Sequence, residues 1–222
     1  LTEQQKDTRC EFEFYIDTKI YDFNSAIESI TKDIYEIIDV EILVDIINLP
    51  TDNDKNNCIQ IKPDISLEDN GIEISVPIIT TASGIEHYIE TICPIINKYG
   101  YTNEETGFHI HISTTKKDGI NFNFYKFMLL CDRAGLLSSW EPRIGYSQNV
   151  MDILSSYTNQ TSRKIKTKKG TVWNVEKTEP NHVEVKSIGG NQYHQKIATM
   201  ILEFSQYCKY FEETLQQDTD EH

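Results

Sequence analysis

The sequence predicts a single α+β domain, a mostly antiparallel sheet with one polar, metal-binding face and helices packed on the other. Two observations predict it. Several short segments alternate apolar and polar residues, as half-buried strands do, and apolar residues recur at helical spacing between them. A length of 222 residues suits one domain with a substantial core. Because neither a repeat nor a linker divides the chain, we expect residues 1–222 to form one unit.

The strand predictions rest on alternation. In residues 10–17, Phe12 and Phe14 share one face, and Glu11 and Glu13 share the other. Similar patterns, or short apolar runs bounded by turn residues, predict the other strands. Their ranges are 40–48, 58–62, 71–78, 107–113, 171–177 and 181–188.

The helix predictions rest on capping signals and Ile spacing. Ser25-x-x-Glu28 and Ser83-x-x-Glu86 match the capping box that starts helices, and Gly100 is a predicted stop. The isoleucines expected in the core are Ile27, Ile30, Ile34 and Ile37 in the first helix, and Ile85, Ile89, Ile92 and Ile96 in the second. Further helices are predicted over 121–137, 147–157 and 191–215, followed by a frayed tail at 216–222.

Composition excludes several classes of protein. The 35 Asp and Glu residues against 21 Lys and Arg give a net charge of −14, which disfavours broad nucleic-acid binding. No apolar run approaches the roughly 20 residues of a membrane helix, and the first residues lack a signal-peptide pattern. The five scattered cysteines favour neither zinc fingers nor a disulfide framework. We therefore expect a soluble cytoplasmic protein, or one of the host cytoplasm if it is viral, with buried thiols.

Basic residues gather in one segment of this acidic chain. They are Arg163, Lys164, Lys166, Lys168 and Lys169. Two interpretations stay open: a solvated loop, or a local contact to a phosphate group.

The polar faces of four predicted strands carry mainly acids and imidazoles. An ordinary solvated face would carry a mixture of Lys, Thr, Gln and Glu. The residues of the four polar faces are Glu11 and Glu13, Glu73, His109 and His111, and His182, Glu184 and Lys186. If the strands are neighbours, the carboxylates repel one another unless cations lie among them. Oxygen ligands with an imidazole favour Mg²⁺ or Mn²⁺ over zinc.

The strand Gly107-Phe108-His109-Ile110-His111-Ile112-Ser113 resembles the Gly-x-His-x-His-x-Ser strand of glutamine synthetases. In size and flanking sequence the chain is most similar to the amidoligase family of that carboxylate–amine ligase superfamily. The resemblance covers about residues 10–204. The other matching positions, in the same order, are Glu11-Phe12-Glu13, Asp64-x-Ser66, Gly71-Ile72-Glu73, Pro77, Pro142-Arg143, Tyr146, Asn174 and His182-Val183-Glu184-Val185-Lys186.

The resemblance implies a glutamine synthetase-like catalytic domain and an ATP-dependent ligase. Such an enzyme joins a small-molecule or peptide carboxylate to an amine through an acyl phosphate, with two or more Mg²⁺ or Mn²⁺ ions. The implied metal ligands are Glu11, Glu13, Glu73, His109 and Glu184. The implied contacts to ATP or the transferring phosphoryl group are His111, Arg143 and Lys186. If the basic segment at 163–169 covers the nucleotide as a lid, Arg163 and Lys164 join them. We also consider Asp64 as a group that binds or deprotonates the attacking ammonium.

Two alternatives stay open, and the first follows from one position that departs from the family pattern. The family usually has Arg where this chain has Lys186, and lysine lacks the bidentate fork that matches a phosphate. The first alternative is therefore a catalytically degenerate, ligase-like protein that binds or inhibits a protein partner. The second is a metal-dependent hydrolase built on the His-x-His strand, with only His182 and His194 left downstream as further imidazole ligands.

Overall fold

The computed structural model describes most of the chain. The described residues are 6–45, 57–67, 69–114, 120–136, 140, 173–174 and 181–217. The predicted helix at 147–157 and the basic segment at 163–169 lie outside them. Of the predicted strand at 171–177, the described part is Trp173–Asn174.

One large sheet forms the centre of the fold, with strand order β2-β3-β4-β1-β6-β9-β8 and β5 paired to β1. The strands are β1 (Lys6–Ile16), β2 (Ile42–Val44), β3 (Ile59–Pro63), β4 (Gly71–Ser75), β5 (Gly100–Tyr101), β6 (Gly107–Thr114), β8 (Trp173–Asn174) and β9 (His182–Gly189). Among the described pairings, only β2 and β3 run parallel. The α+β class and the mostly antiparallel sheet are therefore confirmed.

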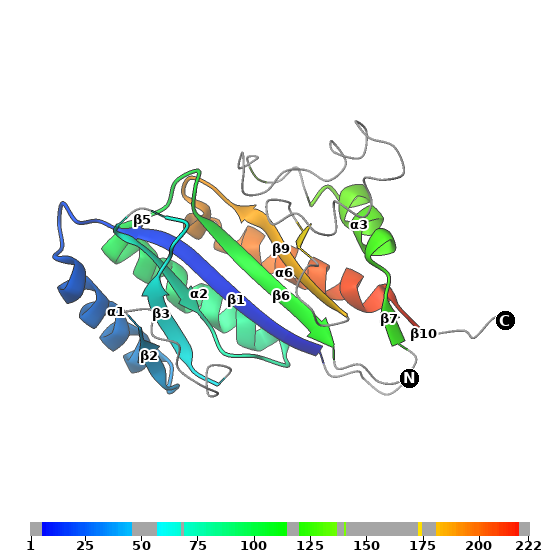
Figure 1. Cartoon of the computed structure of the whole chain (residues 1–222), viewed down its shortest axis with the longest axis horizontal. Coiled ribbons are helices and arrows are strands. Elements are labelled where there is room, and N and C mark those ends of the chain that lie inside the picture. Colours follow the sequence, from blue (N-terminus) through cyan, green and yellow to red (C-terminus); the bar gives the residue numbers. More distant parts are fainter. Residues whose placement is uncertain are drawn as a thin grey trace.

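Three helices cover one face of this sheet (Figure 1). They are α1 (Phe23–Ile37), α2 (Ala82–Tyr99) and α6 (Ile197–Glu213), and a short 3₁₀ turn, η1 (Tyr193–Gln195), precedes α6. The helix α3 (Phe124–Arg133) packs against α6 beyond the β9 side of the sheet. Among the described helices, none is both long and apolar enough to cross a membrane.

The core lies between the sheet and these helices, where the predicted apolar faces meet. Phe12 and Phe14 of β1 are fully buried, and so are the four predicted isoleucines of α2. The prediction for α1 is right for Ile27, Ile30 and Ile34 but wrong for Ile37, which is 55% exposed at the last helical position. The five cysteines are buried thiols that form no disulfide bond.

Both predicted capping boxes are wrong by a few residues. Asp22 caps α1, because its carboxylate accepts hydrogen bonds from the backbone N–H and the hydroxyl of Ser25. The N-cap of α2 is Thr81, two residues before Ser83. The predicted stop at Gly100 is confirmed, and a Cβ there would overlap the carbonyl oxygen of Tyr15, so glycine lets β5 approach β1.

Tertiary pairing changes the ends of other elements. The strand β7 (Ile120–Phe122) pairs with β10 (Leu215–Gln217), where the sequence predicts the start of a helix and a frayed tail. The helix predicted over 191–215 is interrupted between η1 and α6. The strand predicted at 10–17 begins at Lys6, because its first residues pair with β6. Local sequence patterns do not reveal partners so far away in the chain.

Candidate functional site

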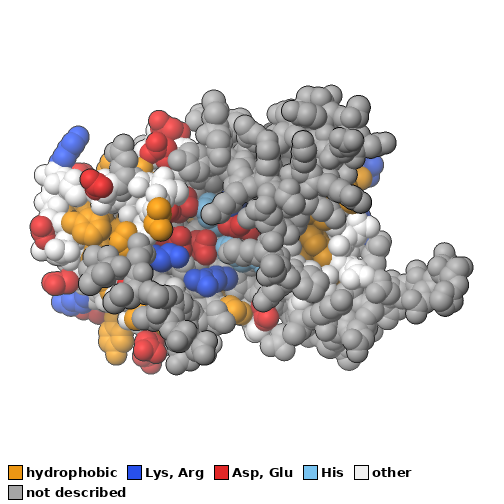
Figure 2. Space-filling model, viewed as in Figure 1, with side chains coloured by type: hydrophobic (Ala, Val, Ile, Leu, Met, Phe, Trp, Pro, Cys, Tyr) orange, Lys and Arg blue, Asp and Glu red, His pale blue; other side chains and the backbone are white. Residues whose placement is uncertain are grey.

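The strand order brings the predicted acidic and imidazole faces together. Antiparallel pairing places Glu11 of β1 opposite His109 of β6, and Glu13 opposite Glu73 of β4. On the other side of β6, His111 lies opposite Glu184 of β9. Figure 2 shows acidic and histidine side chains gathered near the middle of the face opposite α1, α2 and α6. The prediction that these strands are neighbours is confirmed.

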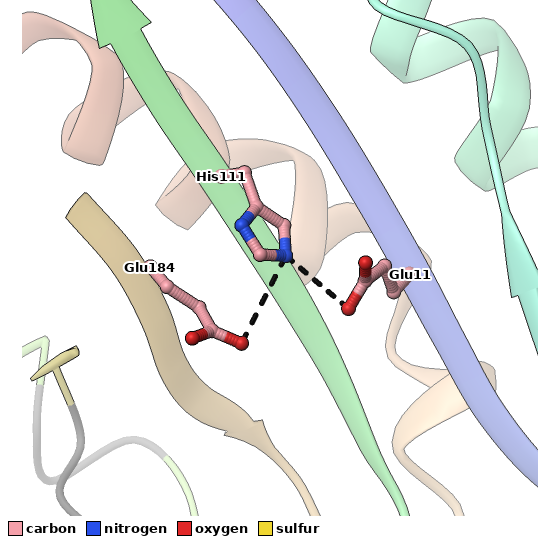
Figure 3. A group of neighbouring side chains, drawn as sticks. All are labelled: Glu11, His111 and Glu184. Atoms are coloured by element: carbon pink, nitrogen blue, oxygen red, sulfur yellow. Dashed lines mark ion pairs between the residues drawn. The ribbon is translucent and has the colours of Figure 1, made fainter. Parts of the chain in front are cut away.

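Three side chains of this face form a compact group: Glu11, His111 and Glu184 (Figure 3). Each offers one ligand atom, and these atoms lie within 4.8 Å of one another. The Nε2 atom of His111 is 3.2 Å from a carboxylate oxygen of Glu11 and 3.8 Å from one of Glu184. Two carboxylates and an imidazole on three adjacent strands can hold a divalent cation.

His109 lies on the other side of the same carboxylates. Its Nδ1 atom is 3.6 Å from Glu11 and 3.9 Å from Glu184, and its Nε2 atom is 3.4 Å from Glu13. The resemblance to amidoligases assigns His109 as a metal ligand and His111 to the phosphates. The structure brings both imidazoles to the cluster, with His111 in the tighter group.

Burial and charge act against each other on these titratable groups. Burial favours the neutral form of Glu11, but the imidazoles of His109 and His111 outweigh it and hold the pKa of this carboxyl well below its ordinary value. Burial likewise opposes the charged form of His109. The carboxylates of Glu13 and Glu11 outweigh that penalty, so the pKa of His109 is raised. Glu11 is therefore ionised at neutral pH.

His182 fixes the orientation of His111. The Nδ1 atom of His111 is 3.3 Å from the Nε2 atom of His182, and the two rings stack with centroids 5.5 Å apart. If Nδ1 of His111 donates that hydrogen bond, Nε2 carries the lone pair that a metal needs. That Nε2 atom is buried and has no hydrogen-bond partner in suitable geometry among the described residues. These residues therefore fit a divalent metal ion. Alternation placed His182 on this face, but no residue spacing indicated its support of His111.

Two lysines also reach the carboxylates. Lys62 of β3 lies 3.0 Å from Glu73, which also accepts a hydrogen bond from Ser75. Lys186 of β9 lies 3.2 Å from Glu184. Lys186 is thus at the site, as predicted, while Lys62 was not among the predicted residues. These cations offset part of the repulsion among the acids.

The other predicted residues lie elsewhere or outside the described residues. Asp64 lies in the turn after β3, where its carboxylate accepts hydrogen bonds from the backbone N–H and the hydroxyl of Ser66. Arg143, Arg163 and Lys164 lie outside the described residues. His194, which the hydrolase alternative would need, instead bonds through Nδ1 to the hydroxyl of Thr102 at 3.0 Å.

No protein-family model matches the chain, and no curated protein matches it. Function is therefore inferred from the site itself and from the motifs in the sequence.

Proposed function

We propose that this chain is an ATP-dependent carboxylate–amine ligase that uses Mg²⁺ or Mn²⁺ and has a glutamine synthetase-like fold. The observation that supports this most is the convergence of Glu11, His111 and Glu184 from three adjacent strands. The match of the Gly-x-His-x-His-x-Ser strand and of Glu184 in the later His182–Lys186 segment to the amidoligase pattern points to the same chemistry. We propose the cytoplasm, where ATP and reduced thiols coexist, as its compartment.

Each residue of the cluster has a proposed task. Glu11, His111 and Glu184 hold one divalent cation, and His109 with Glu13 and Glu73 supplies ligands on the neighbouring strands. A bound cation would neutralise polyphosphate charge. Lys186, beside Glu184, is placed to contact a phosphoryl group next to that cation. It does so as a point charge, without the fork of an arginine.

The proposed reaction proceeds in two balanced steps. An oxygen of the substrate carboxylate attacks the γ-phosphorus of ATP, the bond to the bridging oxygen breaks, and ADP leaves. The amine nitrogen then attacks the acyl carbon, phosphate leaves with the bonding electron pair, and the nitrogen loses a proton. The substrates are a small-molecule or peptide carboxylate and an amine. We retain Asp64 and Arg143 as proposed contacts of the amine and the phosphates.

A binding protein without catalysis is the second candidate, and one observation favours it. Lys62 and Lys186 already form ion pairs with Glu73 and Glu184, so the acidic face is partly neutralised by its own chain. Such a face can be a stable ion network that needs no metal. The acidic face would then be a surface that binds a partner protein. Addition of metal or nucleotide would leave the stability of this chain unchanged.

Thermal unfolding with Mn²⁺, with and without ATP, separates the two candidates. A ligand at about a hundred times its dissociation constant stabilises the native state by about 2.7 kcal/mol. For a chain of this length that raises Tm by about 5–10 °C. Glu184→Gln removes the negative charge of one proposed metal ligand. If the affinity for the ligand falls a hundredfold at the same ligand concentration, only about 0.4 kcal/mol of that stabilisation remains. The matched control is Glu28→Gln, on the exposed side of α1.

The proposal expects a Mn²⁺-dependent ATP shift in the parent and in Glu28→Gln, and its loss in Glu184→Gln. Release of ADP on addition of a carboxylate and an amine would then identify the substrates. A parent protein whose Tm responds to neither metal nor nucleotide contradicts the ligase proposal and favours the binding protein.

A further inference from the structure

A small cavity opens beside the Glu11–His111–Glu184 group, toward the first residues of β1. Its volume is about 140 Å³, and its lining includes Asp7, Arg9, Glu11, His111, Ser113 and His182. Sites that hold a whole small molecule are larger, roughly 300–1,000 Å³. This cavity therefore suits one end group of a ligand whose remainder lies outside it.

Arg9 is the cation of this cavity. It lies on β1 directly opposite His111, two residues before Glu11 and on the same face. Its Nε atom is buried, and no described residue accepts a hydrogen bond from it. A guanidinium stays charged at all relevant pH values, and a buried donor without an acceptor costs stability. Four glutamates lie on this face, and among the described residues none forms an ion pair with Arg9. Arg9 is therefore placed for an anion that comes from outside the chain.

We infer that this cavity binds a carboxylate group of the substrate, through the guanidinium of Arg9. A guanidinium and a carboxylate form two parallel charge-assisted hydrogen bonds, and the planar fork matches two oxygens in one plane. Ser113 and His182, which also line the cavity, offer further donors. The inference rests on the proposed function for one point only, that this carboxylate is the one the enzyme activates.

The position agrees with that task. Glu11 and His111 belong both to the cavity lining and to the three-residue group. An anion held by Arg9 therefore lies next to the place where the cation and the phosphoryl group are proposed to bind. Binding the substrate carboxylate and the polyphosphate of ATP side by side would let these two anions react within one site.

The test uses acetate as the probe, with inorganic phosphate as the competing anion. The ¹H–¹⁵N signal of the Arg9 Nε–H is followed by NMR while each anion is titrated in the presence of Mg²⁺. The inference expects saturable binding of acetate, tighter than that of phosphate. Arg9→Gln should weaken acetate binding at least about tenfold, because it removes charge-assisted hydrogen bonds. Arg9→Lys, which keeps the charge and most of the buried stem, should also weaken it, since lysine cannot hold both oxygens.

The control is Arg133→Gln, an exposed arginine of α3, which should bind acetate like the parent. Mn²⁺ binding by electron paramagnetic resonance shows that each variant is folded and keeps the metal ligands. Acetate binding that Arg9→Gln leaves unchanged overturns the inference, and so does phosphate binding tighter than acetate. If Mn²⁺ binds and acetate does not, the inference fails while the ligase proposal stands. If acetate binds through Arg9 and Mn²⁺ does not bind, the ligase proposal fails and the carboxylate site stands.

Discussion

Replacing Tyr207 by phenylalanine tests how β9, which carries Glu184, is held against the helices. Tyr207 of α6 is fully buried, and its hydroxyl is 2.6 Å from that of Ser187. Ser187 follows Lys186 in β9 and has the same parity as the core residues Val183 and Val185, so alternation places its hydroxyl on the helix side. Burial raises the pKa of Tyr207, so the phenol is neutral at ordinary pH.

The variant leaves the buried Ser187 hydroxyl without its partner, at a cost of about 1–3 kcal/mol. For a chain of this length, Tm should fall by about 2–12 °C. Urea unfolding gives the free energy, and an unchanged m-value shows that the transition itself is the same. The double variant Ser187→Ala with Tyr207→Phe should lose less than the sum of the two single variants, because no unpaired hydroxyl remains. A Tyr207→Phe protein as stable as the parent, or strict additivity in the double variant, would refute the reasoning.

Three further predictions concern the scaffold. Burial lowers the pKa of His194, so the unfolded chain takes up a proton at a higher pH than the folded one. Stability should therefore fall as pH drops below about 6.5, and urea titrations at pH 7 and pH 5 should find a smaller fall in His194→Gln. Gly100→Ala should cost about 1–3 kcal/mol, because the new methyl group overlaps the Tyr15 carbonyl and separates β5 from β1; an unchanged melting curve would contradict this. Asp22→Ala should cost about 0.5–2 kcal/mol by removing the cap of α1, and Asp22→Asn, which can still accept the bond, should recover most of it.

The sequence predicts the centre of this fold well because its strands are half-buried. The two-residue period places Phe12 and Phe14 inward, and that arrangement holds wherever the strand pairs. The pairing of β7 with β10 joins residues near 121 and 216, and local patterning carries no signal for it. The cap at Asp22 is not predicted for a different reason: Ser25-x-x-Glu28 matches a capping box three residues later, whereas in the structure the backbone N–H of Ser25 donates to Asp22.

The sequence predicts which residues of the candidate site share one face of the sheet. It does not predict which of their side chains contact one another. Alternation put Glu11, His109, His111 and Glu184 on one side of the sheet, and the register confirms it. Which imidazole points between Glu11 and Glu184 depends on side-chain rotamers and on the stacking of His182 against His111, which periodicity cannot encode. Arg9 also belongs to this face, but it lies just before residues 10–17, over which the alternation predicts a strand, so the sequence does not predict its place at the site.

The arrangement of Arg9 bears on the choice between a metal site and a self-contained ion network. A network that served only to neutralise itself would pair its cations with its acids, as Lys62 does with Glu73. Lys186 likewise pairs with Glu184. Glu11, however, faces the imidazoles of His109 and His111, and the buried Nε of Arg9, two residues away, has no acceptor among the described residues. The clustered carboxylates are complementary to a bound cation. The guanidinium of Arg9 beside them is complementary to a bound anion. A metal-dependent enzyme acting on a carboxylate needs that pair of sites, and a passive ion network has no use for it.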